Sequence, residues 1–211
     1  MRNIPVFATQ NGVASLTLEE IPYKSCAYVQ VQDSSDTEVF LQECGDFCVA
    51  VGAEHVYATG IGADKYPLYT SILQMHRPIA DILNTDAILC PVEYSTLELW
   101  RSIYNAKMGD VSNASTMTIA KAKTALESGG CYFVYRGDCM LGIGMISEQT
   151  IEAIVSVKPG SGADILSALC QGLNSDFVCV EVSSTNEHAV NFYKKLGFIE
   201  KCHVSDWYQI I

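Results

Sequence analysis

A short glycine-containing segment is the first place in this 211-residue chain where residue types and spacing indicate chemistry. Residues 157–163 read Val-Lys-Pro-Gly-Ser-Gly-Ala, between a stretch typical of a strand and one typical of a helix. Glycines there let backbone N–H groups face outward, and the dipole of the following helix favours an anion. Lys158 adds a positive charge, so the segment indicates a phosphate site. A tight strand-to-helix turn without a ligand fits the same pattern, and Asp164 in the first helical turn favours that alternative.

The nine cysteines are a second set of candidate reactive residues. Their odd number and the lack of any C-x-x-C spacing argue against a disulfide framework and against a zinc site. The histidines share no ligand spacing with one another either. We therefore expect no metal. The cysteines within apolar runs are expected to be small buried hydrophobic residues, namely Cys90, Cys131, Cys170 and Cys179.

The overall charge restricts the kind of partner. The chain has 13 Lys and Arg against 24 Asp and Glu, a net charge of −11. This balance argues against nucleic acid and against an anionic membrane surface as partners, because both carry phosphates that need neutralising. No apolar run approaches the roughly 18 residues of a membrane span, and the first residues lack the apolar core of a signal peptide. We expect a cytoplasmic protein.

The spacing of apolar residues predicts the elements that position these groups. In the second half of the chain, two helices precede a hairpin that turns at Gly137-Asp138, and strands and helices then alternate. The predicted ranges are helices near 95–104 and 116–127, strands over 131–136, 139–147 and 150–157, a helix over 163–173, a strand over 177–182, a helix over 186–196 and two short strands within 198–211. This order predicts an α+β domain over 94–211, with a mixed sheet flanked by helices.

The first ninety or so residues contain a fainter version of the same pattern. The predicted order is a strand over 27–31, a helix over 36–52, a strand over 53–60 and a helix over 65–75. We interpret this β-α-β-α run as a degenerate half-repeat of the later elements, within a domain over 1–93. Asp33 and Asp36 stand where the later copy has its glycines. Two carboxylates repel a phosphate, so the earlier copy is predicted not to bind a nucleotide.

A longer motif lies in the last third of the chain. Its residues are Glu181-Val182, Asn186, Ala189, Phe192-Tyr193 and Gly197-Phe198. The motif resembles the signature that closes the GNAT superfamily of acetyl-CoA-dependent N-acetyltransferases, and its spacing is especially similar to that of ribosomal-protein N-terminal acetyltransferases. The segment at 157–163 resembles the pyrophosphate loop of the same superfamily, although it is shorter and has Val157 at the place of the usual Gln or Arg. The resemblance covers a little over half of the chain and implies a GNAT-type fold preceded by a GNAT-like half-repeat.

The resemblance also implies acetyl-CoA as co-substrate and a set of residues that bind it. The strand that includes Ile154, Val155 and Val157 is expected to splay from the strand over 177–182, so that its free backbone groups bond the pantetheine arm. The N–H groups of four residues are expected to face the pyrophosphate: Gly160, Ser161, Gly162 and Ala163. Asn186 matches a position that helps to shape the cofactor cleft.

Two catalytic roles follow from the same resemblance, with Tyr193 as the general acid and Glu181 as the general base. An amine with a pKa of about 10 must lose a proton before it attacks, and a leaving thiolate with a pKa of about 8.5 benefits from a phenol donor. Glu181 is the one charge in its apolar strand, so we expect partial desolvation and a raised pKa. Alternatively, Glu181 pairs with a neighbour, and Tyr193 packs on the core beside Phe192. Glu152 is a second possible base.

The predicted function is the transfer of an acetyl or short acyl group from acyl-CoA to a small-molecule or peptide amine, by direct attack in a ternary complex. The alternative is a non-catalytic acyl-CoA-binding or protein-interaction module that retains the fold. The shortened loop and the degraded first copy support this alternative. The sequence is compatible with an oligomer and does not identify the amine.

Overall fold

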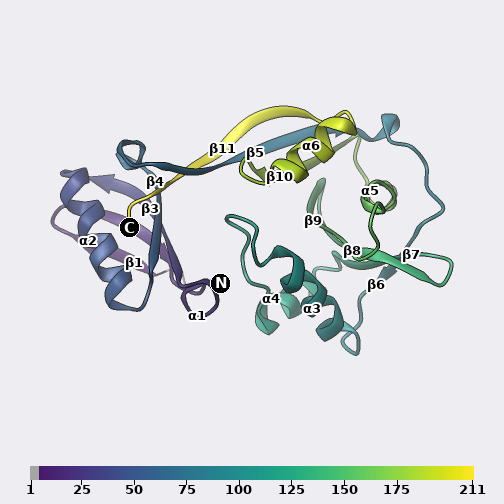
Figure 1. The fold of residues 1–211 in the computed structure, drawn as a ribbon, viewed down its shortest axis with the longest axis horizontal. Helices are drawn as coiled ribbons and strands as arrows, with labels where there is room; N and C mark the ends of the chain where they lie inside the picture. Colours follow the sequence, from purple (N-terminus) through teal and green to yellow (C-terminus); the bar gives the residue numbers. More distant parts are fainter. Residues whose placement is uncertain (1–4) are drawn as a thin grey trace. The chain divides into compact units, whose positions relative to one another are not determined.

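The computed structural model of the protein describes residues 5–211. These residues form two compact units. The first contains the described residues up to Ile72 together with His203–Ile211, and the second contains Leu73–Cys202. Strands β5 (Leu68–Pro78) and β11 (Ile199–Gln209) each pass from one unit into the other (Figure 1). The predicted division between residues 93 and 94 therefore differs from the observed one, because the end of the chain returns to pair with the first unit.

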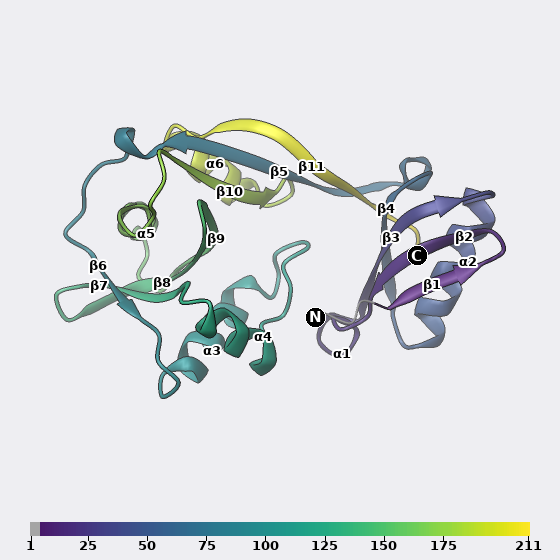
Figure 2. The same ribbon diagram turned by 180° about the vertical axis from the view of Figure 1, so that it is seen from behind.

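The first unit is a sheet with one long helix. Its elements are β1 (Val6–Thr9), β2 (Gly12–Thr17), α1 (Ile21–Lys24), β3 (Cys26–Ser34), α2 (Thr37–Ala50), β4 (His55–Gly60) and η1 (Ala63–Lys65). Strands β3 and β4 are parallel, β1, β2 and β3 are antiparallel neighbours, and β4 pairs with the end of β11. Helix α2 lies along this sheet (Figure 2) and buries Phe40, Cys44 and Cys48 against Val29 and Val56. The predicted strand-helix-strand order is confirmed here.

The predicted helix over 65–75 is wrong, because this segment forms strand β5. Burial along the strand alternates, with Leu73 and Met75 buried between half-buried neighbours. In the sheet, β5 lies between β11 and β10, and both of these strands come from the far end of the chain. Distant strand pairing therefore overrides the local helical spacing. The same pairing explains why the terminal segment is one long strand, β11, and not two short ones.

The second unit has a mixed sheet with helices on both faces. Its elements are η2 (Ile79–Asp81), β6 (Ile88–Pro91), α3 (Leu97–Met108), α4 (Ile119–Glu127), β7 (Cys131–Arg136), β8 (Cys139–Ser147), β9 (Thr150–Ser156), α5 (Gly162–Gln171), β10 (Phe177–Ser183) and α6 (Glu187–Lys195). The sheet order is β5-β10-β9-β8-β7-β6. Gly137 has a φ of 54°, as the predicted hairpin turn requires. The predicted α+β class, with a mixed sheet flanked by helices, is confirmed.

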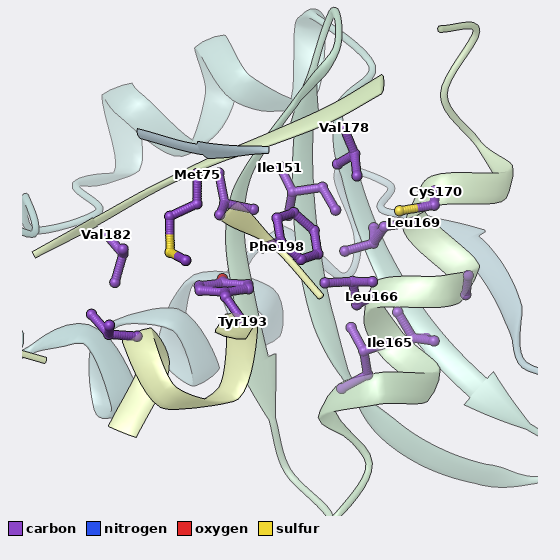
Figure 3. Close-up of a cluster of buried hydrophobic side chains, with 14 of the residues drawn as sticks. Met75, Ile151, Ile165, Leu166, Leu169, Cys170, Val178, Val182, Tyr193 and Phe198 are labelled. Carbon is purple, nitrogen blue, oxygen red and sulfur yellow. The ribbon is translucent and has the colours of Figure 1, made fainter. Parts of the chain in front are cut away.

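Two cores hold the second unit together. One contains Trp100 and Tyr104 of α3, packed against Phe133, Ile143 and Val155 of the sheet. The other is built from the opposite face of the sheet with α5, α6 and the end of β5 (Figure 3). Strand residues alternate between the two cores, so Phe133 belongs to the first and its neighbour Val134 to the second.

Two expectations concern absences. Among residues 5–211 there is no group of three or more His, Cys, Asp or Glu side chains arranged to hold a metal ion. No helix in this described part of the chain is both long enough and apolar enough to cross a membrane. Of the four cysteines expected to be buried, Cys131, Cys170 and Cys179 are buried and Cys90 is half-buried.

Candidate functional site

Strands β9 and β10 separate shortly after they begin to pair. Their parallel ladder joins Thr150 to Cys179 and Ile151 to Val180 and extends no further within the described chain. On its other edge, β9 pairs with β8 at Ile151 and Ala153 but skips Glu152, so Glu152 is the extra residue of a β-bulge. A bulge bends its strand and increases the local twist. The bulge at the last paired residue therefore accounts for the divergence, and the predicted splay is confirmed.

Helix α5 begins directly beyond the diverging strand, and its first amides are uncapped. The first helical hydrogen bond runs from the N–H of Ile165 to the carbonyl of Ser161, at 3.0 Å. The N–H groups of residues 162–164 therefore have no partner within the helix. Ser161 stands at the N-cap position, but its hydroxyl donates to the carbonyls of Leu141 (3.0 Å) and Lys158 (2.7 Å) and leaves the helix uncapped. An uncapped helix start of this kind attracts an anion.

The loop residues predicted to face a pyrophosphate are not equivalent. Gly160 is exposed and has a φ of +82°, with open space around its Cα. Ser161 is buried, and its N–H already donates to the carbonyl of Lys158 at 3.3 Å. Val157, expected in the strand that bonds the pantetheine arm, lies one residue beyond the end of β9; it is exposed, and its N–H donates to the carbonyl of Leu141 at 2.9 Å. The amides left by the helix are those of residues 162–164. The sequence interpretation missed the last of these, Asp164, although its place in the first turn was the signal.

Gly162 brings helix α6 against the start of α5. A Cβ at this position would lie 3.1 Å from Cε2 and 3.2 Å from Cζ of Phe192. These distances are shorter than ordinary van der Waals contact, so only glycine lets the ring approach this closely. The glycine therefore serves packing as well as backbone exposure.

Tyr193 follows Phe192 on α6, and its ring belongs to the core. The side chain is 9% exposed and packs against Phe192 and Phe198, with ring centroids 5.3 Å and 5.4 Å away. In Figure 3 its ring lies beneath Met75 and beside Phe198. Burial raises the pKa of Tyr193 to about 12, so the hydroxyl stays protonated at neutral pH. This position matches the alternative interpretation of the sequence, in which Tyr193 packs on the core beside Phe192.

Glu181 and Glu152 both lie where the two strands part. The last ladder pair is Ile151 with Val180, and each carboxylate belongs to the next residue along its strand. Glu181 is exposed, so the partial desolvation expected for it is not found. Glu152 is exposed too. Burial raises the pKa of the Cys131 thiol to about 11, and the negative charge of Glu152 adds to this rise.

Asn186 fixes the start of α6 next to the end of β10. Its side-chain oxygen accepts a hydrogen bond from the N–H of Ala189 at 3.2 Å and so caps the helix. Its own N–H donates to the carbonyl of Ser183 at 3.0 Å. Ser183 in turn contacts Thr185 (2.8 Å), whose hydroxyl donates to Ser112 in the loop after α3 (3.0 Å). Asn186, which the resemblance predicts to shape the cofactor cleft, therefore acts as the N-cap of α6.

Ile154 and Val155 lie in the part of β9 that has left β10. Val155 is buried in the core beneath α3, and Ile154 packs from the other face of the sheet against the core around α5. Their side chains thus fix the strand from both faces, while the strand edge turned towards β10 carries no ladder beyond Ile151. This unpaired edge is the feature that the resemblance predicts for the pantetheine arm.

Comparisons with known proteins bear on the fold. No protein-family model and no curated protein matches the sequence. Among solved structures, the chain is similar to a GCN5-related N-acetyltransferase from Sphaerobacter thermophilus, with 11% identity, a TM-score of 0.57 and coverage of 94% of this chain and 76% of that one. It is also similar to a GCN5-related N-acetyltransferase from Kribbella flavida, with 7% identity, a TM-score of 0.60 and coverage of 96% and 58%.

A third similar structure is a conserved protein of unknown function from Staphylococcus epidermidis. Its identity is 10%, its TM-score is 0.58, and the match covers 98% of this chain and 93% of that one. At these identities the similarity concerns the fold, which the strand order and the diverging strands β9 and β10 describe independently. The chain has the fold of the GNAT acetyltransferases.

Proposed function

We propose that this protein transfers an acetyl or other short acyl group from acyl-CoA to an amine, by direct attack in a ternary complex. The observation that carries the proposal is the parting of β9 and β10 beside the uncapped start of α5. An unpaired strand edge and three free helical amides are costly unless water or a ligand satisfies them. Their juxtaposition suits a ligand with amide groups at one end and phosphates at the other, which is the chemistry of acyl-CoA.

The residues present fit such a ligand in two places. The edge of β9 from Ile154 onward offers backbone groups to the amides of the pantetheine arm. The amides of residues 162–164 offer hydrogen bonds to the pyrophosphate, and Lys158 lies exposed in the same loop. The two sets are joined by the short segment between Ser156 and Gly162, so one extended molecule reaches both.

The reaction forms a bond from the amine nitrogen to the thioester carbonyl carbon and breaks the bond from that carbon to sulfur. In the proposed mechanism Glu181, directly or through a water, takes a proton from the incoming ammonium, and Glu152 is the alternative base. Tyr193 donates a hydrogen bond to the departing sulfur. Because the pKa of Tyr193 is about 12 and that of a thiol about 8.5, the phenol stabilises the thiolate without transferring its proton completely. As the bond from carbon to sulfur breaks, the nitrogen loses its second proton to solvent, and solvent supplies the proton of free CoA.

The acceptor is an amine, and the net charge of −11 favours a cationic one. A second candidate function is a non-catalytic acyl-CoA-binding or interaction module. Two observations favour it: the packing of the Tyr193 ring into the core, and the use of the Ser161 amide within the loop.

Thermal unfolding with and without acetyl-CoA tests the site. At a ligand excess of 100 times Kd, binding adds about 2.7 kcal/mol, which corresponds to a rise in Tm of roughly 5–10 °C for a chain of this size. If Tm rises, release of free CoA thiol is measured across a panel of amines. A rise in Tm with no release on any amine favours the binding module. An unchanged Tm at millimolar acetyl-CoA contradicts acyl-CoA binding, and with it the transferase, and favours an interaction module that retains the fold.

A further inference from the structure

An acidic residue stands at the helix start where the proposed site needs an anion. Asp164 lies in the first turn of α5, and its N–H is one of the three amides assigned to the pyrophosphate. A carboxylate at this place stabilises the helix but repels a phosphate. Lys158 is the one basic residue in the loop at 157–163. The single positive charge of Lys158 is therefore too little for two tasks at once: it would have to offset the charge of Asp164 and also attract a ligand with several negative charges.

A cation from a different strand is bound to this carboxylate. Arg136, at the end of β7, places Nη2 2.7 Å from Oδ1 of Asp164. The same oxygen accepts a hydrogen bond from the hydroxyl of Thr85 at 3.2 Å. The carboxylate of Asp164 is only 33% exposed, and it is held by two donors that belong to neither the loop nor the helix.

Arg136 also contacts a second carboxylate, which differs in its surroundings. Nε of Arg136 lies 2.6 Å from Oδ1 of Asp86, whose side chain is 75% exposed. Ion pairs this exposed contribute little free energy, because water screens them. The contact with Asp86 is therefore expected to contribute little, whereas the contact with Asp164 changes the charge next to the free amides.

We propose that Arg136 is a positioning residue for the phosphate end of acyl-CoA, which acts by holding and neutralising Asp164. The inference rests on the proposed function. With Arg136 in place, the first turn of α5 presents its amides without an uncompensated negative charge. Without it, the carboxylate of Asp164 leaves an uncompensated negative charge in the same helical turn as the free amides, and its repulsion of the phosphates weakens binding.

Isothermal titration of the full chain with acetyl-CoA tests this inference on four variants: Arg136→Gln, Asp164→Asn, the double variant and Asp86→Asn. We expect Arg136→Gln to raise Kd about fivefold at low salt and by less at high salt. In the Asp164→Asn background the same change is expected to have almost no effect, because the charge that it uncovers is gone. Asp86→Asn is the matched control and is expected to leave Kd unchanged. In the amine assay, Arg136→Gln is expected to raise the KM for acetyl-CoA with kcat unchanged.

Two results overturn the inference while leaving the proposed function intact. One is a Kd for Arg136→Gln equal to that of the unaltered chain. The other is a loss of affinity that persists in full in the Asp164→Asn background, since this assigns Arg136 a direct contact with the ligand. If the unaltered chain itself binds no acetyl-CoA, the proposed function fails and the inference falls with it.

Discussion

The chain contains two parallel strand-helix-strand units whose openings differ. In β3-α2-β4 the ladder has six pairs, from Cys26 with His55 to Val31 with Gly60. In β9-α5-β10 it has two. The ladder between β3 and β4 is therefore closed along its length, whereas β9 and β10 form a fork that opens beyond Ile151 and Val180. The same order of elements thus yields a stable scaffold in one case and a candidate binding site in the other.

The helix starts differ in the same way. Asp36 caps α2 by accepting a hydrogen bond from the N–H of Val39 at 3.3 Å. The chain after β4 also lies close to this helix start, since a Cβ built on Gly62 would lie 2.2 Å from Cγ2 of Thr37. At the start of α5 nothing lies within 4 Å of a Cβ built on Gly160, and no side chain caps the helix. The start of α2 is therefore capped and close to the chain around Gly62, whereas the start of α5 is uncapped and the neighbouring Gly160 is open.

The largest effect is expected for the two carboxylates at the fork, Glu181 and Glu152, which follow the last ladder pair of β9 and β10. We expect Glu181→Gln to lower kcat about a hundredfold, because a positioned base contributes at least this much to proton transfer. Initial rates of CoA release at saturating substrates measure the effect. Glu152→Gln is the matched control, one residue past the same ladder pair. If Glu152→Gln lowers kcat and Glu181→Gln does not, the base is on β9.

A smaller effect is expected for Tyr193→Phe. Loss of a hydrogen bond to a charged sulfur lowers kcat by about tenfold to a hundredfold. The Kd for acetyl-CoA is expected to stay the same, because the ring and its packing against Phe198 are kept. Equal kcat values for the two proteins would remove Tyr193 from the mechanism.

The same variant has a signature in alkali. The pKa of Tyr193 is raised by burial to about 12 in the folded chain, against about 10 when unfolded. Its contribution to stability is therefore complete below pH 10 and is lost as the pH rises towards 12. Chemical unfolding followed from pH 9 upward is expected to show a shallower loss of stability for Tyr193→Phe than for the unaltered chain.

Local patterns in the sequence were sufficient for the order of elements around the fork, and the resemblance implied the parting of its strands, but neither identified the strands that cross between units. Pro159 and Gly160 indicate the turn after β9, and the strand-helix-strand order around it follows from apolar spacing. Strand β5 carries helix-like spacing and becomes a strand only because β10 and β11 pair with it. No short window of sequence contains that information.

The candidate site was predictable in its position and less so in its details. The motif at 181–198 located α6 and the end of β10, and the glycines located the start of α5. The exposure of Glu181 and the inward turn of the Ser161 amide depend on backbone directions that residue types do not encode. The bulge at Glu152 also escaped, because a bulge is a property of the pairing with β8.

The third expected effect comes from making the second helix start resemble the first. Ser161→Asp supplies the kind of cap that Asp36 gives to α2 and adds a negative charge beside the free amides. We expect the Kd for acetyl-CoA to rise about tenfold, since the cap occupies an amide and the charge repels the pyrophosphate. Titration measures Kd, and thermal unfolding without ligand checks that the variant folds. An unchanged Kd in a folded variant would show that the start of α5 does not receive the phosphates.

The smallest effect is expected from the converse change, removal of the cap at the start of α2. Asp36→Ala removes a cap and is expected to lower the free energy of unfolding by about 1 kcal/mol. The ladder between β3 and β4 is closed, and the chain around Gly62 lies close to the start of α2. The Kd for acetyl-CoA is therefore expected to stay the same. Titration of both proteins is also expected to give one acetyl-CoA per chain. A second binding event, or a Kd that changes with Asp36, would mean that the closed unit also takes part in binding.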